Sequence, residues 1–333
     1  MTWNISVPVW GAPYVRIFEG AAAPALLAAV ARLGKAEVKF IIHTSMGEEA
    51  RVRAALPGQE VEVRYIGDSP TYVALQNAHA DAISSTAVGD YVVLLNADLV
   101  VSDNLLMRCA YQFGVGKQAM VLLGIRTVIG PEWPPAGAMP RTLLAWAWAH
   151  RHQIIRDLEW PTGGSLVPTN LFFSSGGSVV ARGFHLHPAA IVKRGDINFR
   201  STIDGDLLDA FPRDSIHVVV DPDDCAMCEI SQSERRFPVR DQGGMNAAKI
   251  AGSMEARASA LHCWLFTHQI CVVGEARDCG DHDAVHDILE NMGRKELLRA
   301  AGRHQPAQVG GRRGRDPGGR RGTVPGSPAD ILP

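Results

Sequence analysis

The sequence predicts an α/β protein whose central sheet is mostly parallel and is flanked by helices. Two observations lead to this class. Short apolar runs alternate with stretches of helical spacing from residue 3 to residue 126, which is typical of strands joined by crossover helices. The apolar run at 91–95, preceded by Gly89 and Asp90, is too short for a helix and has no polar alternation. It is therefore predicted to be a strand buried on both faces.

The first predicted strand, 3–9, ends at Trp10-Gly11-Ala12-Pro13, where glycine and proline open a loop. Pro24 is expected to break or kink the helix that follows, because proline removes a backbone donor. Strand and helix then repeat in turn. The expected strands are 38–42, 61–66, 91–95 and 119–123, and the expected helices are 14–33, 47–56, 72–86 and 105–113.

The later part of the chain is less regular. Residues 171–180 hold Gly176 and Gly177 between apolar flanks, which indicates a bend or the close approach of another group. Two further helices are expected, over 252–273 and 281–299.

The composition changes at Gly302 to glycine, arginine and proline. Such a segment has too few apolar residues to offset the entropy of ordering, so it is expected to be disordered. We therefore expect three parts. These are an α/β domain over 1–235, a helical segment over 236–301 and a disordered tail over 302–333.

The bulk properties narrow the class of protein. The chain has 333 residues, of which 46% are hydrophobic and 20% are charged, as in an ordinary folded protein. A formal net charge of -2 argues against specific nucleic-acid binding. The N-terminal residues do not resemble a signal peptide, and no apolar run reaches about 18 residues, so no transmembrane segment is expected.

The cysteines favour a cytoplasmic protein. There are 6 of them, scattered without the framework of a secreted domain. Cys225 and Cys228 have metal-ligand spacing, but no second pair of this kind accompanies them. We therefore expect buried or incidental thiols here rather than a zinc site.

A polar tripeptide, Asn96-Ala97-Asp98, follows the buried strand. Residues two apart in an extended chain point the same way, so Asn96 and Asp98 are expected to project together from its carboxyl end. Open α/β sheets bind ligands at that edge. An amide and a carboxylate there can hold a hard cation, and the cation can hold a diphosphate. The alternative is a polar turn in which Asp98 or Ser102 caps the next helix.

Polar residues also follow the other predicted strands, at His43, Asp68 and Arg126. Because the carboxyl ends of parallel strands lie at one edge, these side chains are expected to line a common cleft. The first-strand loop does not contain the glycine pattern of a dinucleotide site, and the chain has no P-loop.

Taken together, these features resemble the GT-A fold of nucleotide-sugar glycosyltransferases of the family-2-like kind, which is itself Rossmann-like. The stretch 89–98 is similar to the family's Gly-Asp, apolar run and Asp-x-Asp, with Asn96-Ala97-Asp98 as a variant of that motif. A Ser-Gly-Gly segment and an acidic turn follow later, so the resemblance covers residues 3–230.

The resemblance implies transfer of a sugar from a nucleotide-sugar donor to a glycan or other hydroxyl acceptor, as in polysaccharide biosynthesis. It implies a divalent cation, Mn²⁺ or Mg²⁺, held by Asp98 and Asn96. It also implies a catalytic base at Asp204 or Asp206. The donor-binding residues that it implies are Pro8, Val9, Trp10, Gly11, His43, Asp68, Asn96, Arg126, Gly176 and Gly177.

The chain departs from the family at Asn96, because an amide is a weaker ligand for a hard cation than a carboxylate. Asp98 is then the main ligand, or the metal is loosely bound or absent and Arg126 stabilises the leaving phosphate. The family's late histidine ligand has three candidates, His185, His187 and His217.

Two other classes remain open. One is a nucleotidyltransferase, which usually carries a loop rich in glycine, arginine and lysine after its first strand; residues 10–13 lack such a loop. The other is a non-catalytic GT-A-like nucleotide-binding protein, in which Asn96 marks the loss of the metal.

Overall fold

The computed structural model describes residues 1–66, 71–130, 132–156, 164–167, 169–231 and 246–301. The predicted disordered tail over 302–333 and the predicted donor-binding residue Asp68 lie outside these ranges.

A seven-stranded sheet forms the centre of the molecule, in the order β12-β6-β11-β4-β1-β2-β3. Neighbouring strands are parallel except at β11, which runs antiparallel to both β4 and β6. The predicted α/β class with a mostly parallel sheet is thereby confirmed. The strands of this sheet are β1 (Trp3–Pro8), β2 (Val38–Thr44), β3 (Glu60–Tyr65), β4 (Tyr91–Leu94), β6 (Ala119–Leu122), β11 (His187–Val192) and β12 (Ile216–Val218).

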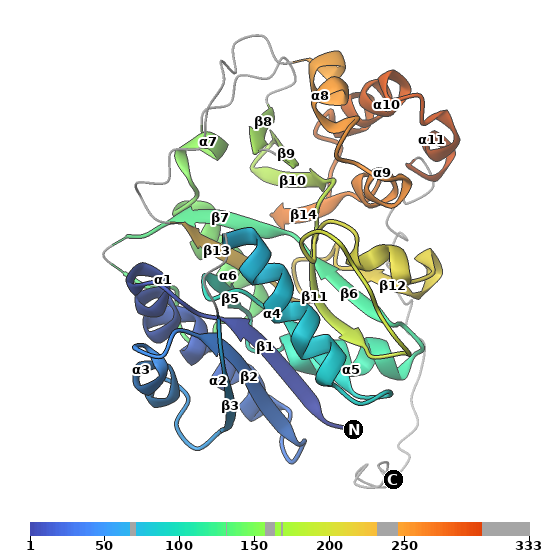
Figure 1. Ribbon diagram of the computed structural model, residues 1–333. Coiled ribbons are helices and arrows are strands. Elements are labelled where there is room, and N and C mark those ends of the chain that lie inside the picture. Colours follow the sequence, from blue (N-terminus) through green and yellow to red (C-terminus); the bar gives the residue numbers. More distant parts are fainter. Residues whose placement is uncertain (67–70, 131, 157–163, 168, 232–245, 302–333) are drawn as a thin grey trace, which may run out of the picture.

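Helices cover both faces of this sheet (Figure 1). On one face, Ile83 of α4 packs into the same core as Val92 and Leu94 of β4. On the other face, Leu26 of α2 and Leu106 of α5 contribute to a second core. Because alternate strand residues point to opposite faces, β4 is buried on both sides, as its apolar sequence predicts. The helices around the main sheet are α1 (Ala12–Ile17), α2 (Ala23–Arg32), α3 (Glu49–Ala54), α4 (Thr71–Ser85), α5 (Leu105–Gly114) and α6 (Pro140–Ala149).

The residues from Ala12 to Arg32 form one long helical stretch, made of α1, the π-helix Phe18–Ala22 and α2. By length and composition it is apolar enough to cross a membrane, with a mean hydropathy of 1.4 over 18 residues. Arg16 and Glu19 interrupt its apolar sequence, which is why no such segment is expected from the sequence. Half of this window is buried in the protein, where the stretch packs on the sheet as a core helix.

Two smaller sheets complete the fold, in the orders β5-β13-β7 and β14-β10-β9-β8. The first begins directly after Asp98, at the carboxyl end of β4, and β13 pairs with both β5 and β7. The second is antiparallel. The strands of the two small sheets are β5 (Leu99–Val101), β7 (Gly124–Val128), β13 (Met227–Ser231), β8 (Gly164–Val167), β9 (Asn170–Ser175), β10 (Ser178–Gly183) and β14 (Ile270–Val273).

The single helix predicted over 252–273 is wrong. Helix α8 ends at Met254, and Ser259 starts a new helix with a capping box in which His262 completes the pair. The chain then forms β14, whose apolar residues pair with β10. The remaining helices are α7 (Gln153–Arg156), α8 (Ala247–Met254), α9 (Ala260–Phe266), α10 (Asp281–Asn291) and α11 (Lys295–Ala301).

Candidate functional site

A cleft of about 320 Å³ lies at the carboxyl ends of β1 and β4. Residues from the main sheet, from both small sheets and from α4 contribute to it. The sequence-predicted residues that line it are Pro8, Trp10, Asn96, Asp98, Arg126, His185, His187 and Asp204. The lining residues that were not predicted as site residues include Tyr14, Tyr72, Gln76, His79, Asn170 and Glu229.

Asn96 and Asp98 are brought together in the cleft as their spacing predicts. The backbone amide of Leu99 donates to the carbonyl oxygen of Asn96 (3.1 Å), which closes a tight turn after β4. The amide of Ile230 on β13 donates to the carbonyl oxygen of Asp98 (2.8 Å). Asp98 is 8% exposed and lines the cleft, so it does not belong to a solvated loop.

Arg126 and Glu229 lie opposite each other on β7 and β13. The Arg126 Nη2 donates to a Glu229 carboxylate oxygen at 2.8 Å, and both side chains are only about one-fifth exposed. Arg126 therefore reaches the cleft as predicted, but as one half of an ion pair. A phosphate bound there would share the guanidinium with Glu229.

The two candidate bases, Asp204 and Asp206, occupy different places. Asp204 lines the cleft. The carboxylate of Asp206 accepts hydrogen bonds from the backbone amides of Arg200 (2.8 Å) and Ser201 (3.0 Å) and from the Ser201 hydroxyl (2.9 Å). Burial works to raise the pKa of Asp206, but these hydrogen bonds outweigh it and lower that pKa. Asp206 thus braces its own loop, and Asp204 is the one of the two that lines the cleft.

Three histidines line the cleft, and burial lowers the pKa of each one. They are therefore neutral near pH 7. His187 Nε2 donates to the carbonyl oxygen of Leu94 at 2.7 Å. His185 stacks on His262 of α9 at 4.3 Å between ring centroids, and His262 Nε2 donates to the carbonyl oxygen of Asp204 at 3.1 Å. The third histidine, His79, belongs to α4 and is 1% exposed.

Several predicted donor-binding residues lie away from the cleft lining. Val9 is fully buried in the core. The amide of Gly11 donates to Glu48 at 3.1 Å, and His43 Nε2 pairs with Asp81 of α4 at 2.7 Å. Gly176 and Gly177 are exposed and form the turn between β9 and β10, with φ of 56° and 81°. Left-handed backbone at both central positions is what a two-residue hairpin requires. The length of strand β9 separates this turn from Asn170, the residue at the other end of β9 that lines the cleft.

No group of three or more His, Cys, Asp or Glu side chains within the described ranges is arranged to hold a metal ion. Cys225 and Cys228 are buried and form no disulfide. Asp98 and Asn96 are the oxygen-bearing side chains at the predicted position. The oxygen of Asn96 lies 3.2 Å from His79 Nε2, so the Asp98 carboxylate is the group that fits a hard cation of the Mg²⁺ type, which is commonly bound by one or two carboxylates together with substrate phosphates.

The cleft is acidic among its described lining residues. Asp98, Asp204 and Glu229 face one cationic side chain, Arg126, while the histidines are neutral. A free diphosphate would be repelled by this arrangement, whereas a diphosphate that carries a divalent cation would not.

The sequence matches no known family and no curated protein. Among solved structures, the inositol-1-phosphate CTP transferase from T. maritima is 12% identical, with a TM-score of 0.37, 78% of this chain covered and 98% of that one. A mycobacterial protein is 16% identical, with a TM-score of 0.33 and coverages of 76% and 74%. A putative glucose-1-phosphate thymidylyltransferase from Bacillus anthracis is 14% identical, with a TM-score of 0.28. This chain covers 57% of the length of that protein, which covers 42% of this one.

Proposed function

We propose that this protein is a cytoplasmic transferase that moves a sugar from a nucleoside-diphosphate sugar to a hydroxyl acceptor. The observation that carries the proposal is the meeting of Asp98 and Asp204 in one cleft at the carboxyl edge of a mostly parallel sheet. One carboxylate follows the central strand, and the other comes from a separate loop. Sugar transfer needs two such groups, one toward the departing diphosphate and one toward the attacking hydroxyl.

The donor is assigned to the side of the cleft formed by β1, α1 and α4. Trp10, Tyr14 and Tyr72 present aromatic side chains there, which suit a nucleobase or sugar ring. Asp98 would hold Mn²⁺ or Mg²⁺, which when bound offsets the charge that develops on the leaving diphosphate. Arg126 supplies a fixed positive charge beside this position.

Asp204 is the proposed base. A hydroxyl that attacks the anomeric carbon must lose its proton, and a carboxylate within hydrogen-bond reach can accept it. The carboxylate of Asp206 is occupied by its own loop, whereas the recorded contact of Asp204 is made through its backbone carbonyl oxygen. The Asp204 side chain is therefore the one available to a substrate.

Nucleotidyl transfer to a sugar phosphate is the second candidate, because the same cleft would suit a nucleoside triphosphate with its cation. The loop after β1 argues against nucleotidyl transfer. The class usually places basic residues there, but residues 10–13 carry no charge, and the Gly11 amide is engaged by the Glu48 carboxylate rather than left for a phosphate.

The deciding experiment is a paired assay on the full chain with MnCl₂. In one arm, UDP-, GDP-, CDP- and dTDP-sugars are supplied and the release of nucleoside diphosphate is measured. In the other arm, nucleoside triphosphates and sugar 1-phosphates are supplied and the release of pyrophosphate is measured. We expect release only in the first arm. Release only in the second would establish nucleotidyl transfer, and calorimetric binding with no turnover in either would establish a non-catalytic binding protein.

A further inference from the structure

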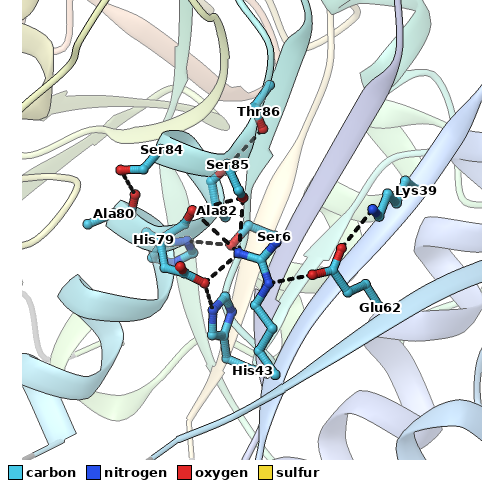
Figure 2. Close-up of polar contacts among 12 residues, drawn as sticks. Ser6, Lys39, His43, Glu62, His79, Ala80, Ala82, Ser84, Ser85 and Thr86 are labelled. Carbon is cyan, nitrogen blue, oxygen red and sulfur yellow. Dashed lines mark hydrogen bonds and ion pairs between the residues drawn. The ribbon is translucent and has the colours of Figure 1, made fainter.

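Asn96, which replaces the first Asp of the family motif, contacts a buried pair of side chains, His79 and Ser6. His79 Nδ1 lies 3.1 Å from the hydroxyl of Ser6 on β1, and His79 Nε2 lies 3.2 Å from Oδ1 of Asn96. Ser6 is fully buried and His79 is 1% exposed. Figure 2 shows the first of these contacts, with the His79 ring turned from α4 toward Ser6.

The hydrogen positions in this chain follow from the chemistry of its two ends. The amide oxygen of Asn96 only accepts, so His79 Nε2 carries the proton and donates it. Nδ1 of the neutral ring then accepts from the hydroxyl of Ser6. Burial lowers the pKa of His79 to about 3, so the ring stays neutral over the whole physiological range.

This chain of donors fixes which side of the Asn96 amide faces the cleft. Oδ1 points to His79, and Nδ2 has no recorded partner in the described part of the protein. A family carboxylate at this position would offer only acceptors, whereas the Asn96 nitrogen offers two N–H donors. Beside Asp98, in a cleft that must accept phosphate oxygens, donors are the complementary groups.

We propose that Asn96 is a hydrogen-bond donor to the bound diphosphate and not a metal ligand, and that Ser6 and His79 are positioning residues that hold it in that orientation. Asp98 is then left as the protein's ligand for the cation at this strand end. The inference rests on the proposed function, because it takes the ligand of the cleft to be a nucleoside diphosphate.

Asn96→Asp separates the two roles, because it keeps an oxygen for His79 but removes the N–H donors. Two quantities are measured on the full chain. The first is the affinity for Mn²⁺ alone, by electron paramagnetic resonance of the free ion. The second is the affinity for UDP, GDP, CDP and dTDP at saturating Mn²⁺, by calorimetry. We expect nucleoside diphosphate affinity to fall about tenfold or more, with Mn²⁺ affinity unchanged or tighter. A gain in both affinities would show that Asn96 is a metal ligand and overturn the inference.

Ser6→Ala tests the positioning role without touching the ligand. We expect it to weaken nucleoside diphosphate affinity severalfold while leaving Mn²⁺ affinity unchanged. Its ¹⁵N spectrum should show loss of the single Nε2–H form of His79, a signal that a general loss of packing would not produce. Ser84→Ala, on the exposed side of α4, is the matched control and should change neither affinity. Unchanged nucleotide affinity in Ser6→Ala would overturn the positioning role. If the wild-type chain binds no nucleoside diphosphate, the proposed function itself fails.

Discussion

The two sides of the cleft are held in place by different means. On the first side, Asn96 is oriented by side chains of regular elements, Ser6 on β1 and His79 on α4. On the second side, Asp204 belongs to a loop that is held mainly through the backbone. His262 donates to its carbonyl oxygen, and Asp206 ties the loop to itself.

Because of this difference, the side chains on the first side are held in one orientation, whereas the loop on the second side is freer to move. Side chains on the first side are fixed in a buried network, which suits the binding of a charged group in one geometry. The second side depends on α9, a helix that belongs to the C-terminal part of the chain. Few side-chain contacts fix Asp204 itself, so its loop can adjust to an acceptor. We infer that the first side binds the donor and that the second side serves the acceptor.

The sharpest test of this division is Asp204→Asn, paired with Asp206→Asn. Removing the base should lower kcat by about 10²–10⁴-fold and leave nucleoside diphosphate affinity unchanged, because the donor is bound by the other side. Asp206→Asn should instead lower the free energy of unfolding by about 1–3 kcal/mol, since it weakens three hydrogen bonds to a partly buried carboxylate. Steady-state kinetics and urea denaturation of both variants provide the measurements. A larger loss of kcat in the folded Asp206 variant would reverse the assignment.

The second test concerns Asp98. Asp98→Asn should weaken nucleoside diphosphate binding in Mn²⁺ by at least about 10–100-fold, the range found when even supporting groups around a metal are removed. The fold should be retained, because the side chain lies at the cleft rather than within a core cluster. Calorimetry with and without Mn²⁺ measures the effect. If Asp98 only braces a turn, the variant will lose stability of about 1 kcal/mol and keep its nucleotide affinity.

The buried network of the first side should also make the free energy of unfolding depend on pH. The pKa of His79 is about 3 in the folded protein, because burial disfavours the charged ring, against an ordinary value of 6.5. The unfolded chain binds this proton between those two values, so stability is complete above about pH 6.5 and falls as the pH is lowered toward 3.

His79→Gln should remove this contribution, which amounts to about 1.4 kcal/mol per pH unit within the window. Urea denaturation at pH 7.5, 6.5, 5.5 and 4.5 measures the slope for both proteins. Below pH 6.5 the free energy of unfolding of the wild type should fall more steeply than that of His79→Gln. Parallel curves for wild type and His79→Gln would show that His79 is not held neutral by burial.

The site residues also differ in how well the sequence could predict them. The central strand, Asn96, Asp98 and Arg126 could be placed because each depends on local order, a buried run followed by polar residues at one sheet edge. Glu229 could not be placed, because it is 103 residues from Arg126 and meets it only through the pairing of β7 with β13.

His79 illustrates a different limit. It lies in a helix that was predicted, α4, but on a face that also carries ordinary polar residues such as Gln76. Nothing in the local pattern distinguishes a histidine that contacts a strand-end amide from one that faces solvent. Its partner Ser6 is likewise one of two polar residues, with Asn4, in an otherwise apolar strand, and the contact appears only when β1 and α4 pack together.

A substitution at Gly177 should have the smallest effect of those considered, and it tests whether the donor also contacts the hairpin between β9 and β10. Glycine within an apolar segment indicates either a turn or the close approach of a ligand, and the structure places both residues in the hairpin between β9 and β10. A Cβ added at Gly177 would meet no atom within 4 Å, so the cost of Gly177→Ala is that of its left-handed backbone, about 1 kcal/mol. Thermal denaturation should show this loss, while calorimetry should show unchanged nucleoside diphosphate affinity. A loss of affinity in the folded variant would mean that the hairpin reaches the donor, as the resemblance to glycosyltransferases implies, and that the donor is not confined to the first side.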